Sequence, residues 1–358
     1  MEPLPYSRAG RLFYMGINMI INNKNNTIIS TIPNEVDILE NDIRGQYPDV
    51  LEILLIDQTT KKNIFWATDS YQHLEKGYEY NSPILPELIT GERGYVIMPR
   101  VEKNKALQKT RVRDMAEVFT PSWVCNAQNN LIDNAWFGFD NVFNAEIISR
   151  YGSHSWETNL NKIIFPKNKT WKHYTQDTRL EIACGEAPYV ASRYDTTTGV
   201  FISVENRIGL LDRKLRIINE NIETSNEWLK ATQIAFKNIY AFEWQGDSLL
   251  LAREAMFFTF LENYLHKFDK QPPLEAIKHI AYIISWNVWQ MDGLKGTIPN
   301  SCSKISETAT NLFGEIETTV SRCEGCKNNN IKKHNGIYCI VKDWSNNDSE
   351  IRFVDLIK

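Results

Sequence analysis

Residues 178–190 read TRLEIACGEAPYV, and this stretch decides the fold expected for the 358-residue chain. An apolar run that stops at a glycine, here Gly185, is typical of a β-strand followed by a tight turn. Residues 239–247, IYAFEWQGD, repeat the pattern: a short apolar run ends at the acidic residue Glu243, and a helical stretch follows. Strands that alternate with helices in this way predict a parallel sheet of the doubly wound α/β type.

The neighbouring segments fit the same alternation. We expect strands at 178–184 and 239–243, and helices at 122–136, 210–221, 226–238 and 248–268. Residues 274–286 are expected to run from a helix into a further strand, with a turn at Asp292 and Gly293. Thr120 suits the N-cap of the first helix, and Pro121 suits its first turn.

The N-terminal part, residues 1–100, is predicted to be a small α+β domain of its own. Residues 51–57 (LEILLID) and 63–68 (NIFWAT) are rich in β-forming side chains and predict a hairpin, and 94–98 (GYVIM) predicts another strand. We find no acidic cluster with a nearby lysine, as a metal-dependent nuclease would need. The basic stretch 100–113 is either a solvated linker or a set of phosphate contacts beside a DNA cleft.

Composition limits the possible classes. The net charge of −4 argues against simple electrostatic wrapping of nucleic acid, although a local basic stripe can still contact phosphates. Residues 1–10 do not resemble a secretion signal, and no apolar run reaches membrane-spanning length. Six cysteines are too few for a disulfide scaffold in a chain of this length. We therefore expect a cytoplasmic protein without a membrane partner, whose cysteines are reduced thiols or metal ligands.

Acidic residues stand at or near the ends of the expected strands: Glu181, Glu243 and Asp292. In doubly wound sheets ligands bind at the carboxyl ends of the strands. There Glu243 can accept hydrogen bonds from both ribose hydroxyls of a nucleoside, and Asp292 can accept one from an adenine amine. Trp244 either stacks on the adenine or packs in the core. Each residue alone is as often an ordinary loop acid or core side chain, and the dinucleotide pattern G-x-G-x-x-G is absent.

Taken together, these motifs resemble the adenine-specific DNA methyltransferases of restriction–modification systems. Residues 117–121 (EVFTP) are similar to the family's F-T-P motif, and 180–190 to its D-P-A-C-G-S-G motif. Residues 239–253 are similar to its ribose-acid motif, and 286–294 to its later G-D-x-L motif. The resemblance covers about residues 110–294, with the motifs in the family's order.

The resemblance implies a Rossmann-like methyltransferase domain over residues 101–300 that binds S-adenosylmethionine. The implied cofactor-binding residues are Phe119, Thr120, Glu181, Ala183, Cys184, Gly185, Glu243, Trp244 and Asp292. Two positions depart from the family pattern. Ala187 replaces the usual second glycine, so a Cβ lies where the turn approaches the ligand, and Ile182 replaces a common proline.

The family's catalytic tetrapeptide, N/D-P-P-Y/F, is absent; the sole Pro-Pro pair, Pro272-Pro273, lies between Gln271 and Leu274. The catalytic half therefore lies on a second polypeptide, or outside this sequence, or residues 287–290 (NVWQ) form a divergent loop with Asn287 as catalytic candidate. The expected function is methylation of the adenine amine in double-stranded DNA, by this chain or as the cofactor-binding half of a split enzyme. The alternative is a non-catalytic DNA-binding or regulatory subunit with the same fold.

The C-terminal segment, residues 301–358, carries a spacing typical of zinc ligands and ends in an apolar, strand-like stretch at 351–357. The pattern is C-x2-C-x7-H-x4-C, formed by Cys323, Cys326, His334 and Cys339, with Cys302 as a substitute for His334 as the fourth ligand. Four protein ligands would make the zinc structural, in a knuckle-like insert; free thiols are the alternative. Lys327, Lys332 and Lys333 would then contact DNA phosphate or form a solvated loop.

Overall fold

The computed structural model describes residues 40–103, 108, 120–310 and 316–357. All described residues belong to one compact unit, Pro33–Lys358. The domain boundaries predicted near residues 100 and 300 both fall inside it.

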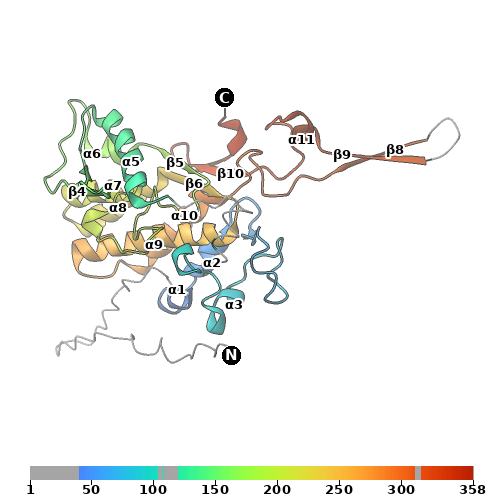
Figure 1. Cartoon of the computed structure of the whole chain (residues 1–358), viewed down its shortest axis with the longest axis horizontal. Coiled ribbons are helices and arrows are strands. Elements are labelled where there is room, and N and C mark those ends of the chain that lie inside the picture. The colour runs from blue at the N-terminus through green and yellow to red at the C-terminus, as the bar shows by residue number, and fades with distance from the viewer. Residues whose placement is uncertain (1–39, 104–107, 109–119, 311–315, 358) are drawn as a thin grey trace. The chain divides into compact units, whose positions relative to one another are not determined.

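The centre of this unit is a parallel sheet of three strands in the order β5 (Arg179–Ile182), β6 (Ile239–Glu243) and β7 (Val288–Gln290). Two helices connect each pair of strands: α7 (Leu210–Asn221) and α8 (Ser225–Lys237), then α9 (Gly246–Phe268) and α10 (Leu274–Asn287). Figure 1 shows these helices packed beside the sheet. A mixed α/β fold with a small parallel sheet is thereby confirmed. Within the described residues the strand order follows the sequence without reversal.

The predicted helices agree with the structure within one or two residues. The first, α5, spans Ser122–Phe137, but Pro121 rather than Thr120 is its N-cap, and no side chain caps it. Residues 274–286 were expected to pass from helix to strand, and they form α10, with β7 starting at Val288. The amphipathic and apolar patterns therefore predicted these helices correctly.

One face of the sheet is only partly covered. Phe242 and Trp289 pack in a cluster with Val341 of the C-terminal hairpin, which consists of β10 (Ile340–Asp343) and β11 (Ser349–Arg352). The hairpin does not cover β5, and the β5 residues Leu180 and Ile182 are 46% and 69% exposed. A hollow of about 680 Å³ opens there. Since parallel sheets are normally covered on both faces, this open side of β5 is unusual.

The N-terminal prediction was partly wrong. Most of residues 51–57 belong to a helix, α2 (Val50–Leu55), and only the short pair β1 (Ile56–Asp57) and β2 (Lys62–Asn63) forms the expected hairpin. The buried side chains of α2 are Val50, Leu51, Leu54 and Leu55, a helical spacing, and α2 packs on α10. A six-residue apolar run does not distinguish helix from strand. Residues 94–98, expected as a strand, form turns and bends.

The remaining elements flank this centre. They are α1 (Glu40–Gln46), α3 (Pro86–Ile89), β3 (Asn144–Ile148), β4 (His154–Thr158), α6 (Trp171–Gln176), β8 (Ile305–Thr310), β9 (Ile316–Ser321) and α11 (Glu324–Asn328). β3 pairs with β4 and β8 with β9, both antiparallel. Of the strand expected at 351–357, β11 covers only the start, because residues 353–355 form a 3-10 helix. Among the described residues, no helix has the length and apolar character that crossing a membrane requires.

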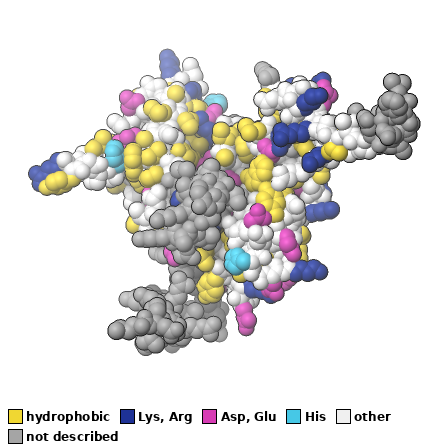
Figure 2. All heavy atoms as spheres, turned by 45° about the vertical axis from the view of Figure 1, so that its right-hand side comes forward, with side chains coloured by type: hydrophobic (Ala, Val, Ile, Leu, Met, Phe, Trp, Pro, Cys, Tyr) yellow, Lys and Arg dark blue, Asp and Glu magenta, His cyan; other side chains and the backbone are white. Residues whose placement is uncertain are grey.

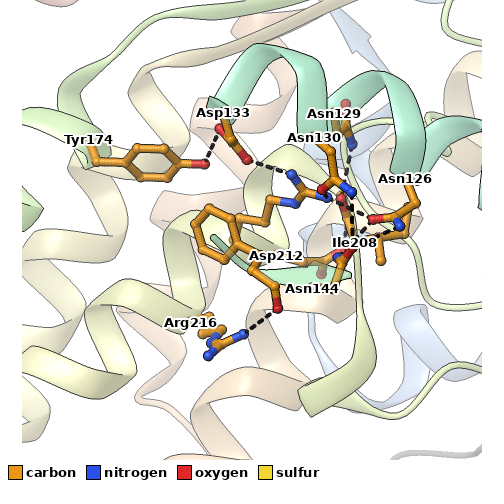
Figure 3. A network of polar contacts seen from close by, with 12 residues as sticks. Asn126, Asn129, Asn130, Asp133, Asn144, Tyr174, Ile208, Asp212 and Arg216 are labelled. Atoms are coloured by element: carbon orange, nitrogen blue, oxygen red, sulfur yellow. Dashed lines mark hydrogen bonds and ion pairs between the residues drawn. The ribbon is translucent and has the colours of Figure 1, made fainter. Parts of the chain in front are cut away.

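A buried polar network joins α5 to α7 (Figure 3). Arg213 of α7 donates to Asp133 Oδ2 at 2.5 Å, and also to the side-chain oxygens of Asn126 and Asn130. Asp133 accepts a further hydrogen bond from the Tyr174 hydroxyl at 2.7 Å. Helix α5 thus turns a polar face inward, and the network holds it against the residues that follow β5.

Candidate functional site

The turn after β5 has an unusual backbone. Ala183, Gly185 and Ala187 have φ angles of 50°, 55° and 57°. For the two alanines this left-handed conformation costs about 1–2 kcal/mol each. The Cys184 N–H donates to the Phe242 carbonyl at 3.0 Å, which fastens the turn to β6. Strained backbone held by its surroundings often occurs at functional sites.

Glu243, the last residue of β6, lies within hydrogen-bond distance of this turn. Its Oε2 accepts a hydrogen bond from the Gly185 N–H at 2.8 Å, and its Oε1 accepts one from the Gln245 N–H at 3.2 Å. Burial raises the pKa of Glu243 above its ordinary value, although these backbone donors oppose the shift. The predicted ribose acid and the predicted glycine turn are therefore in direct contact.

Glu181 of β5 is the second acid at this position. Burial raises its pKa well above the ordinary value; the backbone N–H of Tyr189 opposes the shift, and the charge of Glu243 adds to it. The Oε2 atom of Glu181 is buried and has no hydrogen-bond partner in the part of the chain that the structure describes. An amine or hydroxyl of a ligand would satisfy this acceptor, although some other buried carboxylate oxygens of the described chain also lack a hydrogen-bond donor.

Thr120 borders the same turn. Its carbonyl accepts hydrogen bonds from Thr196 Oγ1 at 3.1 Å and from Cys125 Sγ at 3.7 Å. Burial raises the pKa of the Tyr189 hydroxyl, and the nearby Thr120 side chain opposes that shift. Burial, helped by the charge of Glu181, raises the pKa of Cys125 to about 12, so this thiol is neutral. Phe119, predicted beside Thr120, lies outside the described residues.

The other predicted cofactor residues lie around this centre. Cys184 is buried, and burial raises the pKa of its thiol well above the ordinary value. Trp244 donates from Nε1 to the Tyr80 hydroxyl at 2.9 Å. Asp292 lies after β7; its carboxylate accepts from the Leu294 N–H at 3.1 Å and contacts Lys295 Nζ at 2.8 Å. The structure thus joins Glu181, Gly185 and Glu243, whereas Asp292 belongs to a turn of its own.

Asn287, the candidate for a divergent catalytic loop, has a structural role. It is fully buried, and its Nδ2 donates to the carbonyls of Phe236 and Ile239, each at 3.0 Å. Its Oδ1 accepts from Trp344 Nε1 at 2.8 Å. Both N–H donors are therefore used to join β6 to its neighbours. We correct the catalytic hypothesis for Asn287 accordingly.

Several residues that the sequence analysis missed come from the N-terminal region. Asp247, in the first turn of α9, accepts a hydrogen bond from the Tyr71 hydroxyl at 2.8 Å and lies 3.5 Å from Lys103 Nζ. The backbone N–H of Arg100 donates to Glu186 Oε1 at 2.7 Å, in the turn after β5. Residues assigned to a separate domain thus border the site. Contacts between segments so far apart leave no local signal in the sequence.

The second candidate site is a cluster formed by Cys302, Cys323, Cys326 and His334. Their ligand atoms all lie within 4.8 Å of one another. His334 Nδ1 lies 3.6, 3.7 and 3.6 Å from the Sγ atoms of Cys302, Cys323 and Cys326. A tetrahedral zinc ion with ordinary bond lengths predicts an N···S separation of about 3.6 Å. The donor set and its geometry therefore fit one zinc ion.

Three of the four predicted ligands, Cys323, Cys326 and His334, lie in this cluster. Cys339 does not: it is fully buried, its Sγ lies 3.4 Å from the Gln290 carbonyl, and burial raises the pKa of its thiol well above the ordinary value. Cys302, predicted as a substitute for His334, lies in the cluster together with His334 and takes the place expected for Cys339. The sequence did not rank it higher because the β8–β9 arm separates it from Cys323.

The local structure favours thiolate ligands. A hydrogen bond from the Asn335 backbone lowers the pKa of Cys323 to about 6, and the thiolate is the form that binds metal. Gly325 is required in the knuckle, because a Cβ there would lie 2.6 Å from the His334 nitrogen.

The lysines of the knuckle are exposed, and Lys333 pairs with Glu324 at 2.5 Å. Figure 2 shows Lys and Arg side chains gathered near the base of the β8–β9 arm. Contact of Lys327, Lys332 and Lys333 with DNA phosphate stays a prediction.

Comparison with known proteins finds no match to a family model, a curated protein or a solved structure. The geometry of the two sites therefore carries the functional argument by itself.

Proposed function

We propose that this chain is the S-adenosylmethionine-binding part of a DNA adenine methyltransferase of the restriction–modification kind, with a Rossmann-like methyltransferase domain. The observation that supports this most is the contact between the Gly185 N–H and the Glu243 carboxylate, with Glu181 buried beside them. It lies at the carboxyl ends of two adjacent parallel strands, where α/β sheets bind nucleotides and nucleosides. A DNA substrate also agrees with the predicted cytoplasmic location.

The residues of the turn fit a nucleoside that is joined to an amino acid, as in S-adenosylmethionine. Glu243 would accept hydrogen bonds from the ribose hydroxyls, in part by exchanging its bond to Gly185. The free Oε2 of Glu181 would accept from the cofactor's ammonium group, which removes the penalty of a buried unpaired acceptor. Trp244 would border the adenine, and Asp292 would accept from its amine.

When bound, S-adenosylmethionine would supply an electrophilic methyl group on a sulfonium sulfur. This methyl group would pass to the adenine amine, with the sulfur keeping the electron pair of the broken bond and the amine giving up one proton. Glu181, Glu243 and the turn at Gly185 would hold the cofactor for this transfer, and the flipped base would need a further pocket.

We propose that a second polypeptide, or a part outside this sequence, supplies that pocket together with the N-P-P-Y tetrapeptide. The open side of β5 supports this form of the enzyme. Leu180 and Ile182 are exposed, and within the described residues β5 is an edge strand of the sheet, which readily accepts a further strand. The zinc cluster would serve as a structural element, since four protein ligands leave no open coordination position.

Calorimetric titration with S-adenosylhomocysteine tests the proposal. We expect saturable binding by the wild-type chain and at least a tenfold weaker affinity, about 1.4 kcal/mol, in Glu243→Gln. That variant keeps the shape of the side chain but loses the charge and one acceptor. Glu275→Gln, an exposed position on α10, is the matched control and should bind like wild type.

Two outcomes would separate the alternatives. Wild-type protein that binds no S-adenosylhomocysteine removes the proposal. Binding without any methylation of DNA, even with the polypeptide encoded beside this chain, favours the non-catalytic DNA-binding or regulatory subunit.

A further inference from the structure

Two loops meet beside the end of β7. The first, here called the Asp292 turn, comprises residues 292–298 and carries the acid that the proposed function assigns to the cofactor's adenine. The second, here called the metal loop, comprises residues 334–339 and begins at the metal ligand His334. Their contacts suggest that the two loops behave as one unit.

The backbones of the two loops are paired. The Ile298 N–H donates to the Ile337 carbonyl at 2.8 Å, and the Cys339 N–H donates to the Gly296 carbonyl at 3.0 Å. These two hydrogen bonds are separate from those that pair β7 with β6. A displacement of the metal loop therefore moves the Asp292 turn as well.

Thr297 connects Asp292 with Tyr338 of the metal loop. It forms one isolated β-bridge with Asp292 and another with Tyr338. The Tyr338 hydroxyl in turn accepts a hydrogen bond from the backbone N–H of His334 at 2.7 Å. A short path of hydrogen bonds thus runs from the metal ligand to the backbone of Asp292.

Lys295 adds an electrostatic link. Its Nζ contacts Asp292 Oδ2 at 2.8 Å, and the residue lines a hollow of about 530 Å³ together with Cys302, Cys326 and His334. Three thiolates around one Zn²⁺ leave a net charge of −1, so a loaded cluster favours a cation at this position. Lys295 consequently lies between two negative groups, the Asp292 carboxylate and the loaded cluster, and fixes the position of that carboxylate.

We infer that the metal cluster, through Lys295 as a positioning residue, holds the Asp292 turn in the geometry that recognises the amine of the cofactor's adenine. This inference rests on the proposed function and adds a dependence of cofactor selectivity on the metal. Its specific consequence is that metal loss weakens recognition of the amine more than it weakens binding of the rest of the nucleoside.

Calorimetry with two ligands tests this consequence. S-adenosylhomocysteine carries the amine, whereas S-inosylhomocysteine has a carbonyl oxygen in its place. We expect zinc-loaded protein to prefer the first ligand at least tenfold. After chelation, the preference should fall to about twofold or less, with little change in the affinity for the inosine analogue. Circular dichroism must show that the metal-free protein keeps its helices.

If metal-free protein unfolds, Lys295→Met provides the test, because it keeps all four metal ligands. We expect its preference for the amine to fall at least threefold, while Lys304→Met, at an exposed position two residues after Cys302, leaves the preference unchanged. An unchanged preference in Lys295→Met, or in folded metal-free protein, overturns the inference. If the zinc-loaded wild type binds neither ligand, the proposed function fails and the inference fails with it.

Discussion

Two regions of this molecule hold charged side chains away from solvent. One pairs opposite charges, whereas the other brings two acids together. In the network between α5 and α7, Arg213 lies against Asp133, and asparagine side chains and the Tyr174 hydroxyl add hydrogen bonds. At the turn after β5, Glu181 and Glu243 have the same sign and lie close enough for one to raise the pKa of the other. The charges of the first region are balanced by an ion pair, whereas no described cation pairs with the two acids of the second region.

The difference indicates what each region does. A buried ion pair with amide partners holds two helices in one arrangement, and breaking it leaves a charge without compensation. Two buried acids beside a strained turn lower the free energy of unfolding. Destabilising features of this kind are typically found where the residues bind a ligand. The following predictions test this contrast, from the largest effect to the smallest.

The largest effect is expected in the balanced region. Arg213→Met leaves the buried Asp133 with only the more distant Arg179, 3.6 Å away, as a cation, and should lower the free energy of unfolding by about 3 kcal/mol. Urea denaturation measures this loss. Lys230→Met, at an exposed position on α8, should change stability by less than about 0.5 kcal/mol. A loss below about 1 kcal/mol in Arg213→Met would show that the network does not anchor α5.

The unbalanced region should respond in the opposite direction. Glu181→Gln removes one of the two like charges and should raise the free energy of unfolding at pH 7 by about 1 kcal/mol. In the wild type, burial and Glu243 raise the folded pKa of Glu181. Its stability contribution is therefore present below the unfolded pKa of about 4.3 and is lost as the pH rises through the folded pKa.

Denaturation between pH 4 and pH 8 measures both effects. The decline of stability with rising pH should be shallower in Glu181→Gln than in the wild type. A variant that is less stable than wild type at pH 7, with an unchanged pH dependence, would mean that Glu181 is balanced by a partner in the fold.

The smallest effect concerns the turn itself. Gly185 has a φ of 55°, and a Cβ added there has no other atom within 4 Å. The cost of Gly185→Ala is then backbone strain alone, partly offset by the lower entropy of the unfolded chain, for a net loss of about 0.5 kcal/mol. Urea denaturation of this variant checks the value. A loss above about 2 kcal/mol would indicate that the turn has no room beside Gly185.

The contrast also explains how far the sequence could predict the molecule. Periodic segments such as 210–221 and 239–243 became the helix and strand expected, because their apolar spacing matches one element only. The contact of Gly185 with Glu243 was implied by parallel strand ends meeting at one edge. These features depend on local pattern and on one simple rule of topology.

Other features depend on tertiary contacts that local pattern does not contain. The run 51–57 was expected as a strand and became α2 because it packs on α10. Cys302 lies in the metal-ligand cluster and Cys339 does not, because the β8–β9 arm returns Cys323 to the side of Cys302. Asn287, the last residue of α10, was a candidate for catalysis, yet folding directs its amide to the backbone around β6.

The amide signal of Gly185 tests the central claim most directly. In the free protein this N–H donates to Glu243, and a nucleoside bound at the strand ends must change that bond. Titration with S-adenosylhomocysteine, followed by amide NMR, should shift the Gly185 signal saturably while that of the remote Gly138 stays in place. A Gly185 signal that does not move at saturating ligand would contradict the account.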